Sequence, residues 1–303
     1  MFGRSLDSGG NGYIPESRDL PNTRRVLTVY DLIPVLYPEL FAHGMALTVK
    51  KIFDDILKSI GPDDFFLCIS EATKRDLCTH LGIDPSRAAV TPLAASAELF
   101  FPVGDREQVS AVASRYGLPA GARYLLSVNT LEPRKNMQHA IRCFSAMVQA
   151  ERIRDLYFVL VGTKGWRYDD ILATIAECNL AADRIIVTGY VPDEELAPLY
   201  SGALAFIYPS LYEGFGLPPL EAMQCGTPVI TSNTSALPEV VGDAGIMVDP
   251  SDEDALSAAM LTLYRQSDAR EAMAKRSVER AALFSWSRYT NAVVSGYKAA
   301  LSR

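Results

Sequence analysis

The chain has 303 residues, of which 49% are hydrophobic and 21% charged, a composition typical of one large globular domain or two ordinary ones. A net charge of −7 and an isoelectric point near 5.1 argue against broad nucleic-acid binding. The five cysteines form no CxxC pair and the three histidines lack metal-ligand spacing, so we expect reduced thiols, a cytoplasmic protein and no metal site.

The N-terminal part of the chain is predicted to form a small α/β unit. Residues 1–24 lack apolar periodicity and are expected to be a loop. Amphipathic periodicity predicts a helix over 47–60, and Ser70 is a suitable N-cap for a second helix that ends at Leu81. Residues 92–105 are predicted to be an extended linker. Short apolar runs bounded by polar residues predict strands at 25–30, 65–69 and 89–91.

A second and longer α/β series is predicted from about residue 106. Its strands are expected at 124–128, 157–161, 184–188, 203–208, 228–231 and 245–248. Its helices are expected at 137–151, 170–178, 194–201, from 218 to a C-cap at Gly226, and at 253–266, 268–283 and 287–301. Uninterrupted apolar strands alternating with helices predict parallel sheets covered on both faces. The chain is therefore predicted to form two doubly wound, Rossmann-type domains, 1–105 and 106–285, followed by a last helical segment, 286–303.

Two carboxylates, Glu213 and Glu221, lie eight residues apart around a glycine-rich turn and a Pro-Pro pair. Proline is favoured in the first turn of a helix, so the backbone N–H groups of Phe215, Gly216 and Leu217 should point out of a helix N-terminus that attracts phosphate. Carboxylates repel phosphate but accept hydrogen bonds from hydroxyl groups, so the stretch predicts a nucleotide-sugar site. The structural alternative is an ordinary loop before a helix, where such residues are common.

Two further loops follow predicted strands, at the edge of the sheet where doubly wound folds bind ligands. Arg134 and Lys135 precede a helix N-terminus, an unfavourable place for cations that favours phosphate binding; the alternative is a solvated basic pair. Val191 lies in a turn that could hold a flat base, or that simply ends in a helix cap. We expect one crevice with the diphosphate on Arg134 and Lys135, the ribose on Glu221 and the sugar on Glu213.

Four segments match the usual motifs of one enzyme family: Glu-Pro-Arg-Lys-Asn at 132–136, Glu-x7-Glu at 213–221, Gly-Thr-Pro-Val-Ile at 226–230 and Ser-Ala-Leu-Pro-Glu-Val-Val-Gly-Asp-Ala at 235–244. Over roughly residues 26–300 the chain resembles the retaining GT-B glycosyltransferases of the large group 1, or GT4-type, family. The resemblance implies two domains facing a cleft and a last helix that crosses back to the N-domain. It also implies catalysis without a metal, because cationic side chains and a helix N-terminus neutralise the leaving diphosphate. Retention is usually ascribed to same-face attack, with a donor phosphate oxygen assisting removal of the acceptor proton. The implied donor-binding residues are Arg134, Lys135, Val191, Glu213, Phe215, Gly216, Leu217 and Glu221.

The chain also departs from the family pattern. Tyr30 stands where the family often has a histidine near the sugar, and the resemblance places the next residue, Asp31, with Glu213, Arg134 and Lys135 among the catalytic residues. The N-terminal, acceptor-side domain is expected to be incomplete, without its first βα units. Since an open sheet edge must be covered or paired, a second copy of the chain or an N-terminal partner is expected there.

The predicted function is transfer of a hexose from a nucleotide-diphosphate sugar to a polysaccharide or a lipid-linked glycan, without a cofactor. GDP-mannose is favoured over UDP-sugars because of the Glu-Pro-Arg-Lys-Asn variant. The alternative is a catalytically impaired nucleotide-sugar-binding module or partner subunit. A sugar-nucleotide epimerase, a phosphorylase or a nicotinamide enzyme fits less well, since there is no pyridoxal-site lysine motif and no strand that leads into GxGxxG.

The helix predicted over 47–60 carries Lys50, Lys51 and Lys58. It could lie on an anionic membrane, which would place the protein peripherally at the inner face, or it could pack on the N-domain sheet with solvated lysines.

Overall fold

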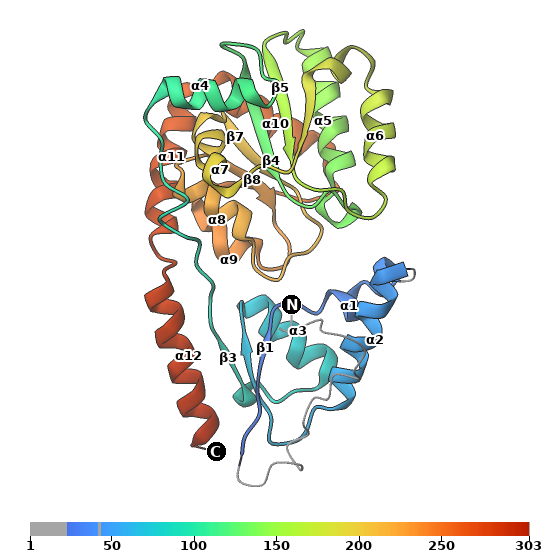
Figure 1. Ribbon diagram of the computed structural model, residues 1–303, viewed down its shortest axis with the longest axis vertical. Helices are drawn as coiled ribbons and strands as arrows, with labels where there is room; N and C mark the ends of the chain where they lie inside the picture. The colour runs from blue at the N-terminus through green and yellow to red at the C-terminus, as the bar shows by residue number, and fades with distance from the viewer. Residues whose placement is uncertain (1–22, 42–43, 303) are drawn as a thin grey trace. The chain divides into compact units, whose positions relative to one another are not determined.

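The computed structural model of the chain describes residues 23–41 and 44–302. The chain forms two compact units, the first made of Met1–Leu93 with Trp286–Arg303 and the second of Ala94–Ser285 (Figure 1). The division lies before Ala94 rather than at the predicted boundary between residues 105 and 106. Segment 94–105 packs on the second unit: the Phe100 ring lies edge-on to Tyr200 at 6.0 Å, and the Val103 N–H donates to Ser201 Oγ at 3.0 Å.

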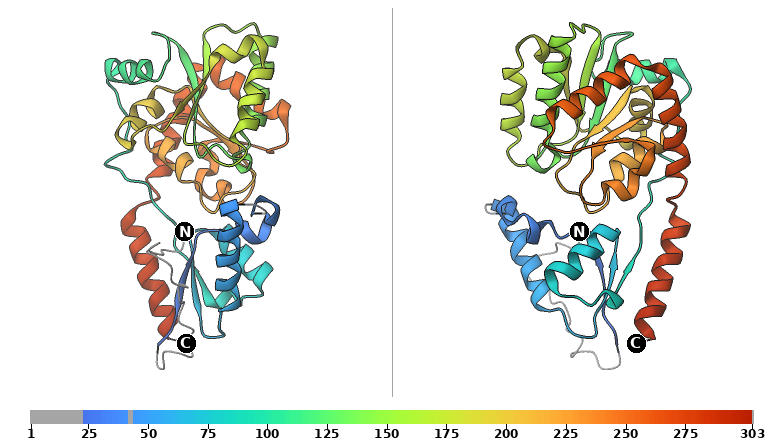
Figure 2. Two further views of the ribbon diagram at one scale, coloured as in Figure 1. Left: turned by 45° about the vertical axis from the view of Figure 1, so that its right-hand side comes forward. Right: turned by 180° about the vertical axis from the view of Figure 1, so that it is seen from behind.

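The first unit is built on a three-stranded parallel sheet in the order β1-β2-β3. The core on one face, around Phe66 and Leu77, is covered by helices α1 to α3, and Ser70 Oγ caps α3 by accepting the Thr73 N–H at 3.0 Å. The other face is covered by α12 (Figure 2). The two pack closely, since a Cβ on Gly296 would lie 2.4 Å from Leu67 Cδ2. The elements are β1 (Val26–Val29), α1 (Ile33–Leu36), α2 (Gly44–Lys58), β2 (Phe65–Cys68), α3 (Glu71–Leu81), β3 (Ala88–Val90) and α12 (Trp286–Leu301).

The second unit is built on a six-stranded parallel sheet in the order β6-β5-β4-β7-β8-β9. Its strands are β4 (Arg123–Val128), β5 (Leu156–Val161), β6 (Ile185–Gly189), β7 (Ala205–Tyr208), β8 (Val229–Ser232) and β9 (Ile246–Val248). Its helices are α4 (Arg106–Arg115), α5 (Met137–Ala150), α6 (Tyr168–Glu177), α7 (Asp193–Gly202), α8 (Leu217–Gln224), α9 (Leu237–Val241), α10 (Glu253–Arg265) and α11 (Ser267–Ala281).

Helices cover both faces of this sheet, as the uninterrupted apolar strands predict. Helices α5, α6 and α10 pack on one face, and α7, α8 and α9 pack on the other, with α4 against α7 (Figure 1). Side chains on both faces of the central strands are fully buried, including Leu125, Leu126, Phe158 and Val159. The predicted doubly wound architecture is therefore confirmed for this unit.

The strand order creates a switch point beside β4. From β4 the chain builds outward through β5 and β6 on one side, and it then returns to place β7 on the other side. Ligands of doubly wound folds bind outside the carboxyl ends of the strands at such a point. The loop that leaves β4 carries Arg134 and Lys135, and the loop that leaves β7 carries Glu213. These three predicted site residues therefore flank the switch point.

The predicted C-cap of the helix after Glu213 is displaced by one residue. Helix α8 ends at Gln224 with Cys225 as the C-cap, and Gly226 follows with a φ of +74°. Its N–H donates to Met223 O at 3.0 Å, which closes the helix in the left-handed conformation that glycine favours.

Two of the three lysines of α2, Lys50 and Lys58, form ion pairs along the helix surface. Lys50 Nζ lies 2.8 Å from Asp54 Oδ2, and Lys58 Nζ lies 3.4 Å from Asp55 Oδ1. These carboxylates offset most of the positive charge that membrane binding by this helix would require. Within residues 23–41 and 44–302, no helix has the length and apolar character to cross a bilayer.

Candidate functional site

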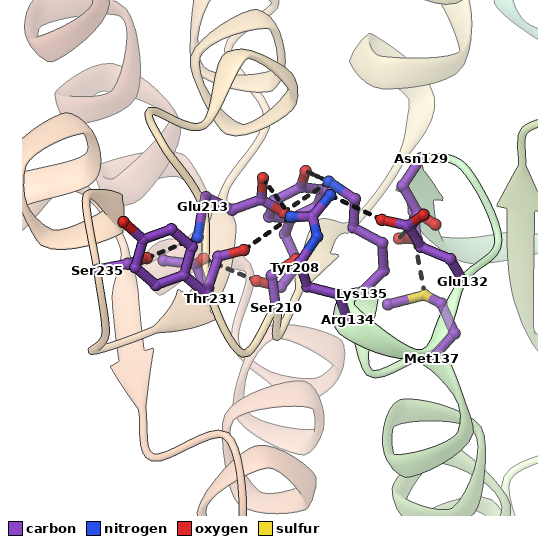
Figure 3. Close-up of polar contacts among 12 residues, drawn as sticks. Asn129, Glu132, Arg134, Lys135, Met137, Tyr208, Ser210, Glu213, Thr231 and Ser235 are labelled. Atoms are coloured by element: carbon purple, nitrogen blue, oxygen red, sulfur yellow. Dashed lines mark hydrogen bonds and ion pairs between the residues drawn. The ribbon is translucent and has the colours of Figure 1, made fainter. Parts of the chain in front are cut away.

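The centre of the site is a cluster of four charged side chains at the switch point, Glu132, Arg134, Lys135 and Glu213, here called the charge cluster (Figure 3). Arg134 Nη1 lies 2.9 Å from Glu213 Oε2, and Lys135 Nζ lies 2.6 Å from Glu213 Oε1. The second guanidinium nitrogen of Arg134 lies 2.7 Å from Glu132 Oε1. With two cations and two carboxylates, the charge cluster has a net charge of zero. Glu213 at its centre is buried, with 8% exposure.

The turn that carries both cations is fixed by its own sequence. Pro133 begins a short 3₁₀ turn, Pro133–Lys135, and Asn136 then takes a left-handed φ of 59° before α5 begins. The turn is bonded to the loop after β7: Arg134 O accepts the Leu211 N–H at 2.9 Å, and Arg134 Nη1 donates to Tyr212 O at 2.7 Å. The loops on either side of the switch point are therefore tied together by the residue that also binds Glu213.

The backbone of Glu213 is held by the loop after β8. Its N–H donates to Ser235 Oγ at 2.9 Å, and its carbonyl accepts the Ala236 N–H at 3.4 Å. Ser235 has a φ of 53°, which is unusual for a residue other than glycine. Strained backbone of this kind is concentrated at functional sites.

Electrostatics keep Glu213 ionised. Burial alone would raise the pKa of Glu213, but the positive charges of Lys135 and Arg134 outweigh it and hold that pKa below its ordinary value. Burial likewise works to lower the pKa of Arg134, and the carboxylates of Glu213 and Glu132 raise it instead. Burial lowers the pKa of Lys135, against the opposing effect of Glu213. A carboxylate held in this way accepts hydrogen bonds and is unsuited to donate a proton.

The N-terminus of α8 presents free donors, as the Pro-Pro pair predicts. Within the described residues, the backbone N–H groups of Phe215, Gly216 and Leu217 have no hydrogen-bond acceptor. Gly216 is the N-cap residue with a φ of 115°, and no side chain caps the helix. The Phe215 ring is anchored edge-on against Phe284, with ring centroids 5.8 Å apart. This helix end can therefore bind an anion.

Glu221 occupies a different environment from Glu213. It lies one turn inside α8, and Tyr200 donates its hydroxyl hydrogen to Glu221 Oε2 at 2.9 Å. Burial raises the pKa of Glu221 from its ordinary value of 4.5 to about 7, because no cation compensates the lost hydration.

A raised pKa makes stability depend on pH in a defined direction. Between about pH 5 and 7 the folded chain keeps a proton on Glu221 that the unfolded chain has lost. The free energy of unfolding should therefore fall as the pH rises through this window, by about 1.4 kcal/mol for each unit of pKa difference. Urea denaturation of the wild type and of Glu221→Gln at several pH values measures this component. Parallel pH profiles for the two proteins would contradict it.

The other predicted residues, Val191 and Asp31, belong to other parts of the chain. Val191 is buried and follows β6, which is separated from β7 by β5 and β4, so the proposed base turn lies farther along the same sheet edge. The Gly162 N–H donates to Gly189 O at 2.9 Å and links the ends of β5 and β6. Asp31 belongs to the first unit, where its Oδ1 accepts the Ile33 N–H at 3.1 Å at the start of α1.

Four residues of the site were not predicted. Glu132 belongs to the Glu-Pro-Arg-Lys-Asn motif without a predicted role, yet it is an ion-pair partner of Arg134. Ser235 likewise belongs to a family motif without a predicted role. Tyr200 and Tyr208 bond to Glu221 and Lys135, and nothing in their spacing indicated this, because both occupy apolar positions of a helix and a strand.

Comparison with known proteins adds independent information. A model of the family Glycosyl transferases group 1 matches residues 111–280. The chain is 36% identical over 290 residues to O-antigen chain mannosyltransferase B of Escherichia coli, covering 96% of this chain and 73% of that protein. It is 26% identical over 274 residues to the serotype-specific mannosyltransferase WbdA of Escherichia coli, covering 90% of this chain and 33% of WbdA. The solved structure of sucrose-phosphate synthase from Thermosynechococcus elongatus matches with a TM-score of 0.75 at 25% identity, covering 94% of this chain and 70% of that one.

Proposed function

The chain belongs to the group 1 glycosyltransferases and shares their GT-B fold, and on that premise we propose that it moves a hexose, with retention, from a nucleotide-diphosphate sugar to a glycan. The observation that carries the proposal is the charge cluster at the switch point, beside the uncapped N-terminus of α8. Cations and free N–H groups suit a diphosphate, and an ionised Glu213 suits sugar hydroxyls.

The proposed donor is GDP-mannose. O-antigen chain mannosyltransferase B and WbdA, which are similar to this chain over nearly all its length, are both named as mannosyltransferases. The Glu-Pro-Arg-Lys-Asn motif at 132–136 favours the same sugar. The acceptor is proposed to be a polysaccharide or a lipid-linked glycan, handled peripherally at the inner face of a membrane.

Each proposed role follows from the charge of the residue. In the reaction the bond between the anomeric carbon and the diphosphate oxygen breaks, and an acceptor oxygen takes its place on the same face of the sugar. Arg134 and Lys135 stabilise the negative charge that the departing diphosphate gains. The acceptor proton passes to an oxygen of that diphosphate, because two cations lower the pKa of Glu213 and make it a weak base, and Glu213 serves instead as an acceptor for sugar hydroxyls.

Two further parts of the chain contribute to the proposal. Glu221 would bind the ribose and Val191 would lie against the base, both on the nucleoside side of the diphosphate. Asp31 of the first unit is proposed as a further catalytic residue. Within the described residues, β1 pairs only with β2, and we propose that a second copy of the chain or a partner protein covers its other edge.

Lys135→Ala should weaken GDP binding by about 1.5–3 kcal/mol, the value of a hydrogen bond to a charged group. Titration calorimetry with GDP measures this, and Lys58→Ala is the control, because Lys58 forms only an exposed pair whose loss costs little. Unchanged GDP affinity in a folded Lys135→Ala protein would refute the diphosphate role.

Turnover of labelled GDP-mannose tests the activity itself, with UDP- and ADP-sugars in parallel. Release of GDP with transfer of label to a glycan acceptor is the expected result. Tight GDP binding without turnover would favour the alternative, a nucleotide-sugar-binding module without catalysis.

A further inference from the structure

A row of four aromatic rings is buried in the second unit: Phe100, Tyr200, Phe206 and Tyr208, here called the aromatic row. Adjacent ring centroids are 6.0 Å apart for Phe100 and Tyr200, 5.3 Å for Tyr200 and Phe206, and 5.7 Å for Phe206 and Tyr208. The last three side chains are at most 1% exposed. The row joins α7, which carries Tyr200, to β7, which carries Phe206 and Tyr208.

The two tyrosine hydroxyls of the aromatic row bond to donor-site residues. Tyr208 accepts a hydrogen bond from Lys135 Nζ at 2.8 Å, and its ring centroid lies 5.1 Å from the same nitrogen. Tyr200 donates to Glu221 Oε2 at 2.9 Å. A phenylalanine would fill the same apolar space, so packing alone does not account for a hydroxyl at either position.

We propose that the aromatic row is a positioning device, in which Tyr208 orients Lys135 for the diphosphate and Tyr200 orients Glu221 for the ribose. The inference rests on the proposed donor site and adds two residues to it. Neither tyrosine is expected to touch the donor, since both are buried beneath the residues that do.

The benefit at Lys135 is a reduced ordering cost. A lysine side chain carries about 2 kcal/mol of rotamer entropy, which binding would otherwise have to overcome. Its ammonium group has three N–H donors. Glu213 Oε1 takes one at 2.6 Å and Tyr208 takes a second, which leaves the third for a phosphate oxygen.

At Glu221, the hydrogen bond from Tyr200 fixes the orientation of the carboxylate and limits the rise of its pKa. The hydroxyl of Tyr200 works against the effect of burial and lowers the pKa of Glu221. Without this hydroxyl the carboxylate would lose its anchor and would hold its proton to a higher pH. Ribose recognition should then weaken near neutral pH and recover as the pH rises.

The chain offers a matched control in Tyr124. Its side chain is 3% exposed, and its hydroxyl donates to the Leu199 carbonyl at 2.7 Å, so Tyr124→Phe also removes a buried hydroxyl bond in this unit. This bond reaches neither Lys135 nor Glu221. If a general loss of stability were responsible, GDP affinity should fall in all three Tyr→Phe variants. If the hydroxyls position donor-site residues, GDP affinity should fall only in Tyr200→Phe and Tyr208→Phe.

The test compares the affinities of the three variants for GDP and for 2′,3′-dideoxy-GDP. Tyr208→Phe should weaken both ligands about tenfold, because Lys135 regains rotamer freedom that binding must then overcome. Tyr200→Phe should weaken GDP about tenfold near pH 7 and dideoxy-GDP by less than about twofold, because only GDP carries the ribose hydroxyls. Tyr124→Phe should leave both affinities unchanged.

Retained GDP affinity in Tyr208→Phe and Tyr200→Phe would overturn the inference, as would an equal loss of both ligands in Tyr200→Phe. If wild-type protein bound no GDP, the proposed function would fail, and a ligand-free measurement would still decide the role of Tyr200. Carbon-13 NMR of the Glu221 carboxyl should show a higher pKa in Tyr200→Phe than in wild type or Tyr124→Phe. Identical titrations would overturn the inference for Tyr200.

Discussion

Glu213→Ala should reduce transfer about 10²- to 10³-fold, a loss comparable to that of one preorganised transition-state contact, while changing GDP affinity far less. The carboxylate is expected to bond sugar hydroxyls, so its loss falls on the reacting part of the donor. The nucleoside diphosphate loses no direct contact and is freed from a neighbouring negative charge. Glu213→Ala should therefore lower kcat strongly and change the Kd for GDP only a little.

The same substitution should also destabilise the fold. Arg134 and Lys135 would lose the carboxylate that both contact at 2.9 Å and 2.6 Å. Removing one member of a buried ion pair typically costs about 3–5 kcal/mol, because the remaining charge is left uncompensated. Glu151→Ala is a suitable control, since its pair with Arg265 is largely exposed and should contribute less than about 1 kcal/mol.

Glu213→Gln separates stability from chemistry. The amide keeps the size and one acceptor oxygen of the side chain but loses its charge. Urea denaturation and initial-rate kinetics on Glu213→Ala, Glu213→Gln and Glu151→Ala are the measurements. Equal losses of kcat and of GDP affinity in Glu213→Ala would show that the assigned contact with the sugar is wrong.

Gly162→Ala should destabilise the second unit by more than about 4 kcal/mol, at the extreme of single substitutions. Gly162 has a φ of +147°, and an added Cβ would lie 1.7 Å from the carbonyl oxygen of Asn129. This neighbour is backbone at the end of β4, and it cannot rotate away as a side chain would. The clash would push apart the ends of β4 and β5 beside the site.

Gly121→Ala provides the control for Gly162→Ala. Gly121 also has a positive φ, +74°, but no atom lies within 4 Å of its added Cβ. The free energy of unfolding of Gly121→Ala should fall only by the cost of placing alanine in the left-handed conformation, about 1–2 kcal/mol. Thermal or urea unfolding of the two variants measures the difference, and similar losses would mean that β4 and β5 separate more easily than their contact indicates.

Most of the fold follows from local sequence patterns. Each strand of the second unit contains an apolar run, because both faces of the sheet are covered, and such runs are visible without a structure. Helices α1 and α9 escaped prediction because each is too short to show a period. Helix α4 buries only Val112 and Ala113, so its apolar stripe was weak, although Asp105 caps it by accepting the Glu107 N–H at 2.9 Å.

The charge cluster was only partly predictable. Motifs placed Arg134, Lys135 and Glu213 at the ends of strands, but chain order does not state which strands are neighbours in the sheet. The structure places β7 directly beside β4 and thereby brings these side chains into contact. The bond of Tyr200 joins α7 to Glu221 of α8, and the bond of Tyr208 joins β7 to Lys135 in the turn before α5. Both depend on tertiary packing, and no sequence period encodes them.

The zero net charge of the charge cluster has a consequence for how the donor arrives. A balanced group of charges produces little field at a distance, so it cannot draw an anion through solution as a patch of like charge does. Free phosphate and other small anions would feel little long-range attraction to the charge cluster and would be bound only on contact with the N-terminus of α8. Donor capture at this site should therefore proceed at an unassisted diffusional rate with weak dependence on salt, and discrimination should occur at contact, where shape and hydrogen bonding decide which molecule stays.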